Sequence, residues 1–194
     1  MATSFWADPV LEPKRQYRFR LLLKNNNAYT IKSVTNPTVA ISSTPHKFLN
    51  HTFYYPGRAE WQPIDVTFVD PQNPDQTAKL YAKLRAMGYR SPTSDAKALF
   101  GFTKKQATDT LGSVRIQTLG PKEGGGSALA GGQGDLDVIG EWKLWNPFFT
   151  NISWGNFSYD SEDLIELSTT IQYDYAEYSG KGAAEELTTG INQD

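Results

Sequence analysis

Hydrophobic and polar residues alternate along several short runs of the chain, which is the pattern of β-strands that bury one face. Residues 61–69 show it clearly, because Ile64, Val66 and Phe68 share one side while Asp65 and Thr67 share the other. Pro45 and the Pro56–Gly57 pair are expected to close the strands that precede them. Similar patterns predict strands at residues 15–24, 29–34, 38–43, 113–119 and 136–145, and a strand or extended loop at 48–55.

The longest alternation runs over residues 164–175 and predicts a strand with one buried face and one polar face. The buried face would hold Ile165, Leu167, Thr169, Ile171, Tyr173 and Tyr175. The polar face would hold Leu164, Glu166, Ser168, Thr170, Gln172 and Asp174.

One segment has the signals of a helix, and it spans residues 73–87. Asn73 is placed as its N-cap, Pro74 as its first residue, and Gly88 just after its end. An apolar stripe at helical spacing favours core packing over a binding groove. The stretch that follows, residues 90–110, has no clear period and predicts a long loop with a short strand at 98–102.

Composition supports a mainly β protein with a single core domain. Aromatic residues make up 13% of the 194 residues, and the chain contains 16 Gly and 11 Pro. These values favour strands joined by turns over a helical bundle. A chain of this length can bury one sizeable core.

Charge and cysteine content exclude several classes of function. A net charge of -2 leaves no basic surplus for a dedicated nucleic-acid binder. The absence of cysteine excludes disulfides and thiolate metal sites. We find no signal peptide and no apolar span of about 20 residues, so we expect a soluble chain that does not enter a membrane.

No group of residues has the spacing of a catalytic or cofactor site. His46 and His51 match no metal motif, and a solvent-facing loop is favoured for both. The Gly-rich stretch 124–134 lacks the Gly-Lys-Ser/Thr ending of a phosphate loop, which favours a flexible loop. The acidic pair Glu162–Asp163 is typical of a solvated turn. We therefore expect no enzymatic activity and no cofactor.

Two apolar regions have no evident use in a single copy. The first is an N-terminal arm with Phe5 and Trp6, which would pack either on its own domain or on a neighbouring subunit. The second is aromatic and comprises Trp142, Trp145, Phe148, Phe149 and Trp154. Both suit a subunit whose sheets continue into neighbouring copies, because strand edges carry unpaired amide and carbonyl groups.

The C-terminal third resembles the tail tube proteins of T4-like contractile-tailed bacteriophages, in the tail tube and Hcp-like superfamily. The resemblance rests on residues 140–152 (Gly-Glu-Trp-Lys-Leu-Trp-Asn-Pro-Phe-Phe-Thr-Asn-Ile), on Asp160, and on the strand 165–175. The opening Phe-Trp-Ala-Asp-Pro and the strand from Arg15 are also similar to the family. About two thirds of the chain can be aligned by eye; the Gly-rich insertion and the tail after Tyr178 depart from the pattern.

This resemblance implies a mainly β fold, a two-sheet antiparallel β-sandwich or half-barrel with one flanking helix. Six copies would form a ring whose long strands join into one barrel around a lumen. The implied organisation is an assembly arm at 1–14, one domain at 15–178 with an insertion at 121–135, and a flexible tail at 179–194.

The resemblance also implies which surfaces meet the lumen and the neighbouring subunits. The lumen would be lined by Glu166, Ser168, Thr170, Gln172 and Asp174, whereas interfaces would use Phe5, Trp6, Trp142, Trp145, Phe148 and Phe149. A polar, neutral or acidic wall lets DNA slide, because Lys and Arg would hold its phosphates. The alternative is that this polar face is the solvent side of a sandwich.

The implied partners are the protein itself, a tail sheath protein, and baseplate, tube-initiator and terminator proteins. Genomic DNA would pass through the lumen without specific binding, and the location would be the virion tail. Three alternatives remain open: a tube initiator of the baseplate, a secretion-system ring protein of the same fold, and a carbohydrate-binding β-sandwich that stacks sugars on Trp142, Trp145 and Trp154.

Overall fold

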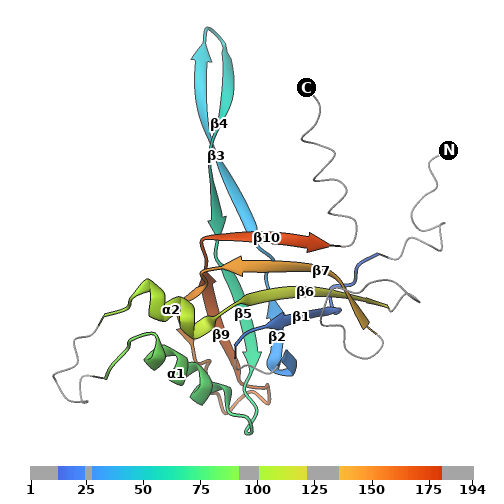
Figure 1. The fold of residues 1–194 in the computed structure, drawn as a ribbon, viewed down its shortest axis with the longest axis vertical. Helices are drawn as coiled ribbons and strands as arrows, with labels where there is room; N and C mark the ends of the chain where they lie inside the picture. The colour runs from blue at the N-terminus through green and yellow to red at the C-terminus, as the bar shows by residue number, and fades with distance from the viewer. Residues whose placement is uncertain (1–12, 25–27, 92–100, 122–135, 181–194) are drawn as a thin grey trace. The chain divides into compact units, whose positions relative to one another are not determined.

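The computed structural model describes residues 13–24, 28–91, 101–121 and 136–180 (Figure 1). The fold is mainly β, with antiparallel sheets and two α-helices, which confirms the predicted fold class. The chain divides into two compact units. Unit 1 comprises Met1–Arg20, Ile116–Glu141 and Tyr178–Asp194, and unit 2 comprises Leu21–Arg115 and Trp142–Glu177. The arm, most of the insertion and the tail after residue 180 lie outside the described residues.

Unit 2 contains a four-stranded sheet in the order β2-β5-β9-β8. Its strands are β2 (Ile31–Val34), β5 (Ile64–Val69), β8 (Phe148–Ser153) and β9 (Glu166–Gln172). Ile64 of β5 lies opposite Ile171 of β9, and Phe68 lies opposite Leu167. All four side chains are fully buried, so the predicted alternation in both strands is confirmed. A short 3-10 helix, η1 (Ala28–Thr30), precedes β2.

The predicted strand at 164–175 is two strands in two sheets. β9 ends at Gln172, and β10 (Tyr175–Gly180) belongs to the other four-stranded sheet. Between them, the backbone amide of Asp174 donates to the carbonyl of Trp145 at 3.0 Å. Alternation did not reveal the break, because the residues on either side of it are both in strands.

A two-stranded antiparallel ribbon occupies the region where sequence predicts short interrupted strands. β3 (Thr38–Phe48) pairs with β4 (His51–Gln62). The prediction that Pro45 and Pro56–Gly57 end strands is wrong, because in a two-stranded ribbon each strand keeps one free edge where proline needs no partner. Gly57 is required by close packing: a Cβ atom there would lie 2.3 Å from Ser42 Oγ.

The β3–β4 ribbon is exposed on both faces. Every residue from Thr38 to Glu60 is exposed, and Figure 1 shows the ribbon extending beyond the other elements of unit 2. Only its base is anchored, because the half-buried Trp61 ring contacts Trp142 and Tyr173 with centroids 6.4 and 6.1 Å apart.

The predicted helix forms as α1 (Gln76–Ala86), shorter at its start than expected. Asp75, and not Asn73, is the N-cap, and its carboxylate accepts from the Ala78 amide at 2.8 Å. The Asp70 carboxylate accepts from the Gln76 amide as well, at 2.8 Å. These two acidic groups satisfy the first amides of the helix and place its beginning. Gly88 follows its end with a φ of 122°, as predicted.

A second helix, α2 (Lys104–Leu111), replaces the second half of the predicted 90–110 loop. Thr103 caps it, and Gly112 with a φ of 64° ends it. Eight residues with a single buried pair, Ala107 and Leu111, are too few to show a helical period in the sequence. The structure has no strand at residues 101–102 of the predicted 98–102 strand, whose other residues lie outside the described ranges.

The second four-stranded sheet has the order β1-β6-β7-β10. The strands not yet given are β1 (Phe19–Leu22), β6 (Val114–Pro121) and β7 (Leu136–Trp145). Within unit 1, the Arg20 guanidinium donates to Gln117 Oε1, and Gln117 Nε2 donates to Glu141 Oε2. The Gln117 side chain is buried, so this polar chain satisfies an amide that has little access to water.

In the described ranges, no helix combines the length and apolar character needed to cross a membrane.

Candidate assembly surfaces

The outward face of the β2-β5-β9-β8 sheet is polar. Glu166, Ser168, Thr170 and Gln172 alternate along β9 with the buried Leu167, Thr169 and Ile171. The neighbouring strands continue the polar face, since Asp65 and Thr67 of β5 lie opposite Thr170 and Ser168. Four of the five predicted lumen residues therefore share one surface.

Charges on this face are few and mostly paired. Lys32 forms an ion pair with Glu166, and Thr170 Oγ1 donates to Asp65 Oδ1 at 2.7 Å. Lys32, Asp65 and Glu166 together leave the face close to neutral and slightly acidic. Such a surface offers a polyanion no concentrated positive charge.

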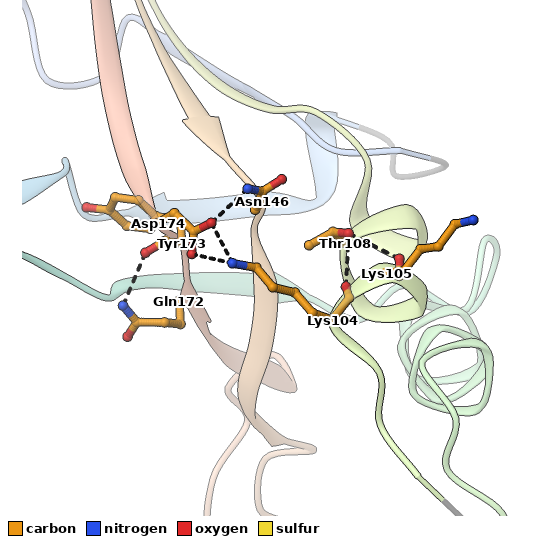
Figure 2. Close-up of polar contacts among 7 residues, drawn as sticks. All are labelled: Lys104, Lys105, Thr108, Asn146, Gln172, Tyr173 and Asp174. Carbon is orange, nitrogen blue, oxygen red and sulfur yellow. Dashed lines mark hydrogen bonds and ion pairs between the residues drawn. The ribbon is translucent and has the colours of Figure 1, made fainter.

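The fifth predicted lumen residue, Asp174, lies beyond the end of β9 and has other partners. Figure 2 shows its carboxylate between Lys104 Nζ, at 2.6 and 2.9 Å, and Asn146 Nδ2, at 2.7 Å. The hydrogen bond from Lys104, followed by that from Asn146, lowers the pKa of Asp174. This cluster joins the start of α2 to the link between β9 and β10.

The predicted interface tryptophans have partners inside unit 2. Trp142 contacts Trp61, and Trp145 stacks on Tyr175 with centroids 5.6 Å apart and an interplanar angle of 17°. The Trp145 indole donates to Glu177 Oε2 at 2.8 Å. Trp154 lines a separate groove along β8, so the three tryptophans of the carbohydrate hypothesis each have a different setting.

Phe148 and Phe149, the other predicted interface residues in the described ranges, both line the groove along β8. Phe148 is half-buried and Phe149 is buried. Phe5 and Trp6 lie outside the described residues.

Sequence reasoning missed the aromatic surface of the β3–β4 ribbon. Directly opposed residues of an antiparallel pair share a face. The register places on one face the pairs Phe48–His51, His46–Phe53 and Thr44–Tyr55. The other face carries Lys47–Thr52, Pro45–Tyr54 and Ser43–Pro56. The run of three consecutive aromatic residues at 53–55 could have indicated it, because such a run places aromatic side chains on both faces of a strand, but the prolines obscured the strand pattern.

Two polar side chains, Gln76 and Lys83, lie on the buried face of α1. Burial, and then the nearby Lys79, lowers the pKa of Lys83 to about 8. The Gln76 amide is fully buried, and neither of its polar atoms has a hydrogen-bond partner in the described part of the chain. An apolar replacement of Gln76 is therefore expected to stabilise the fold.

The acidic and histidine side chains of the described residues are the possible ligands of a metal site. Within the part of the chain that the structure describes, His, Asp and Glu side chains form no group of three or more that could hold a metal ion. His46 and His51 lie on the exposed ribbon, where His46 contacts the Tyr55 ring with centroids 6.5 Å apart.

Comparison with known proteins gives matches in structure only. No protein-family model matches the sequence, and no curated protein matches it significantly. A chain in the structure of the anti-feeding prophage tube terminating cap matches with a TM-score of 0.59 and 15% identity, over 93% of this chain and 99% of that one. A chain in the extended PVC sheath–tube complex of an extracellular contractile injection system matches with a TM-score of 0.58 and 14% identity, over 92% and 99%.

The chain has a tail-tube-like fold. A chain from the PVC sheath/tube terminator supports it with a TM-score of 0.56 and 14% identity, over 87% of this chain and 98% of that one. The tail-tube-like fold thus extends over nearly the whole length of both chains in each comparison. At these identities the likeness concerns the fold, and the function has to be argued from the surfaces.

Proposed function

We propose that the chain is a non-enzymatic structural subunit that assembles into a hollow tube. In this proposal six copies form each ring, stacked rings form the tail tube of a contractile-tailed phage, and the lumen conducts DNA during ejection. The observation that carries the proposal is the β3–β4 ribbon, whose exposed aromatic residues no other described part of the chain covers.

The exposed β3–β4 ribbon has little to stabilise it in a single subunit. Two strands without a third strand or a covering helix are marginally stable in water. Phe48, Phe53 and Tyr55 on one face are 61%, 52% and 59% exposed. Contiguous exposed apolar surface of this kind marks interaction sites. Neighbouring copies of the same chain would cover it in a closed or stacked assembly.

The polar face of the β2-β5-β9-β8 sheet is the proposed lumen wall. Glu166, Ser168, Thr170 and Gln172 would face the channel, with Asp65 and Thr67 beside them. The nearly neutral, slightly acidic character of this face would let DNA pass without retention, because phosphate retention needs Lys and Arg. We leave Asp174 out of this wall, since its carboxylate binds Lys104 and Asn146.

The proposed partners are those of a contractile tail: a sheath around the tube, a baseplate or initiator at one end and a terminator at the other. The similar chains come from the structures of a sheath–tube complex, a tube terminating cap and a baseplate. Their shared fold supports a place in such a particle, which for this chain would be the virion tail.

Electron microscopy of the purified full-length protein tests the proposal. In negative stain we expect hollow tubes or six-fold rings without any other protein present. The variant Phe53→Ser/Tyr55→Ser should keep the circular dichroism spectrum of the folded chain and lose assembly. Tyr159→Ser, at a fully exposed tyrosine outside the ribbon, is the matched control and should assemble normally. A wild-type protein that stays monomeric at high concentration would contradict the proposal.

An end component of the same tube is a second candidate. Chains of terminator and baseplate structures share the fold, so the fold is compatible with subunits that cap a tube as well as with those that extend it. An end component would form single rings that do not elongate, whereas a tube subunit would grow into long tubes. The same micrographs distinguish the two.

A further inference from the structure

Both histidines of the chain lie on one face of the β3–β4 ribbon. His46 of β3 lies opposite Phe53 of β4, and His51 of β4 lies opposite Phe48 of β3. Directly opposed residues of an antiparallel pair share a face, and so do residues two apart on one strand. The two imidazoles therefore belong to the same surface as the exposed rings of Phe48, Phe53 and Tyr55.

Neither imidazole has a partner of opposite charge among the described residues. Both side chains are exposed, and the ring of His46 contacts the Tyr55 ring edge-on. Tyr55 is the other titratable residue on this face, whereas Tyr54 is on the opposite face. The remaining charged residues of the two strands lie on the opposite face or toward the base of the ribbon: Lys47, Arg58 and Glu60. No carboxylate of the ribbon thus lies beside either imidazole.

Covering this face favours the neutral form of both imidazoles. Removing an ionised side chain from water without a partner of opposite charge costs free energy. A neutral imidazole avoids this cost and packs against aromatic rings, as His46 does with Tyr55. Histidine is the side chain that ordinarily changes its charge between pH 5 and 8, and carboxylates and most lysines titrate outside this range. The aromatic face is therefore the part of the ribbon at which a change of pH near 6 alters the charge.

We propose that the β3–β4 ribbon makes assembly sensitive to pH, because its aromatic face joins a second copy while His46 and His51 are neutral and separates when they are protonated. The proposal rests on the self-assembly proposed above, which makes a second copy the occupant of this face. An exposed histidine binds a proton as the pH falls through about 6.5, and a covered one without an acidic partner does not. Assembly therefore releases protons and weakens as the pH falls.

The number of histidines on the face determines how steeply assembly depends on pH. Each proton that a subunit must release changes the assembly constant by up to about tenfold per pH unit. With two histidines in each ribbon, the critical concentration for assembly should rise by up to about 100-fold per pH unit below pH 6. A ribbon with one histidine should reach at most about tenfold per pH unit.

Sedimentation of the full-length protein at pH 5.0, 5.5, 6.0 and 7.0 measures the critical concentration. His46→Gln and His51→Gln should each reduce the pH dependence, and the double variant His46→Gln/His51→Gln should remove most of it. Tyr159→His is the matched control, because it adds an imidazole at a fully exposed position outside the ribbon and should keep the wild-type dependence. Circular dichroism at pH 5 checks that the separated subunits remain folded.

Proton release by the wild-type protein is a second measurement, and it needs no variant. In weakly buffered solution at pH 6, assembly should release protons, and at pH 7.5 it should release far fewer. If the double variant does not assemble, this measurement decides, and the absence of release at pH 6 overturns the inference.

Three results of the sedimentation would overturn the inference and leave the proposed tube in place. The first is a critical concentration that does not change with pH, and the second is an equal change in the wild type and the double variant. The third is tighter assembly at lower pH, which would mean that a carboxylate of the neighbouring copy pairs with the imidazoles. A wild-type protein that assembles at none of these pH values overturns the proposed function as well.

Discussion

The β5–β9 pair and the β3–β4 ribbon are both antiparallel strand pairs, yet they differ in what covers them. In the sheet, Phe68 is 0% exposed and packs with its opposite neighbour Leu167 inside the fold. In the ribbon, Phe53 is 52% exposed. The same residue type therefore stabilises the single chain in one place and is available to another molecule in the other.

This difference separates two uses of apolar surface. Burial inside the chain stabilises folding by about 25 cal/mol per Å² of apolar area removed from water. The ribbon buries much less apolar area in a single copy, because Phe48, Phe53 and Tyr55 remain more than half exposed, and a second molecule could cover the rest. Stability and assembly should therefore respond to substitutions in different regions.

The largest expected effect comes from making the same Phe→Ala substitution in the buried β5–β9 pair and in the exposed β3–β4 ribbon. Phe68→Ala should lower the free energy of unfolding by about 3–5 kcal/mol, because it leaves a cavity in the core. Phe53→Ala should change it by less than about 0.5 kcal/mol, because the side chain is at the surface. Urea unfolding of the unassembled subunit, followed by tryptophan fluorescence, measures both. Equal losses would show that the ribbon is folded into the core in solution.

The second prediction concerns Lys83, a charged residue on the buried face of α1. Lys83 has a pKa of about 8 in the folded chain, below its usual 10.5. Between these values the unfolded chain binds more protons, so the free energy of unfolding should rise with pH, by on the order of 2 kcal/mol. Lys83→Met should remove this rise, whereas Lys105→Met, at an exposed site on α2, should preserve it. Urea midpoints at pH 7.5, 9 and 10 give the comparison.

The third prediction concerns Gln76, a neutral polar residue on the buried face of α1. Gln76→Met should raise the free energy of unfolding by about 1 kcal/mol, because it replaces a buried amide without hydrogen-bond partners by an apolar side chain of similar length. Gln72→Met, at an exposed position before α1, should have almost no effect. A loss of stability in Gln76→Met would mean that the amide has a partner outside the described residues.

The smallest expected effect belongs to the exposed ion pair of Asp174. Its pKa is lowered in the folded chain, so its contribution is complete above the unfolded value near 4 and is lost as the pH falls further. Asp174→Asn should therefore cost stability at pH 6.5 and little at pH 3. Solvent screening keeps the difference below about 1 kcal/mol. Asp160→Asn, at an exposed loop carboxylate, is the matched control, and an equal pH dependence in the two variants would argue against the pair.

Sequence patterns predicted the elements whose apolar residues recur at the spacing of a strand or a helix. β5, β7, β9 and α1 form where alternation or helical spacing placed them, and Gly88 ends α1 as expected. The polar face of β9 was also predicted down to single residues. In β5 and β9 one face is buried and the other is not, which is the property that periodicity records.

The errors occurred where the neighbouring strand or a cap determined the structure. Pro45 and Pro56 are compatible with strands only because the ribbon has two free edges, and the sequence does not show strand number. α2 depends on a cap at Thr103 and on tertiary packing of two residues. The change of sheet at Asp174 depends on a bond to the distant Trp145 carbonyl. The groove along β8 arises from segments far apart in the chain.

The Arg20–Gln117–Glu141 chain in unit 1 has a consequence for strand alignment. Gln117 lies on β6, between β1 and β7, and its amide oxygen accepts a hydrogen bond from Arg20 while its amide nitrogen donates one to Glu141. A slip of either outer strand by two residues would keep every apolar face in place and would still separate a charged group from this amide. These hydrogen-bonded side chains thus favour one strand register over others that hydrophobic packing alone would tolerate.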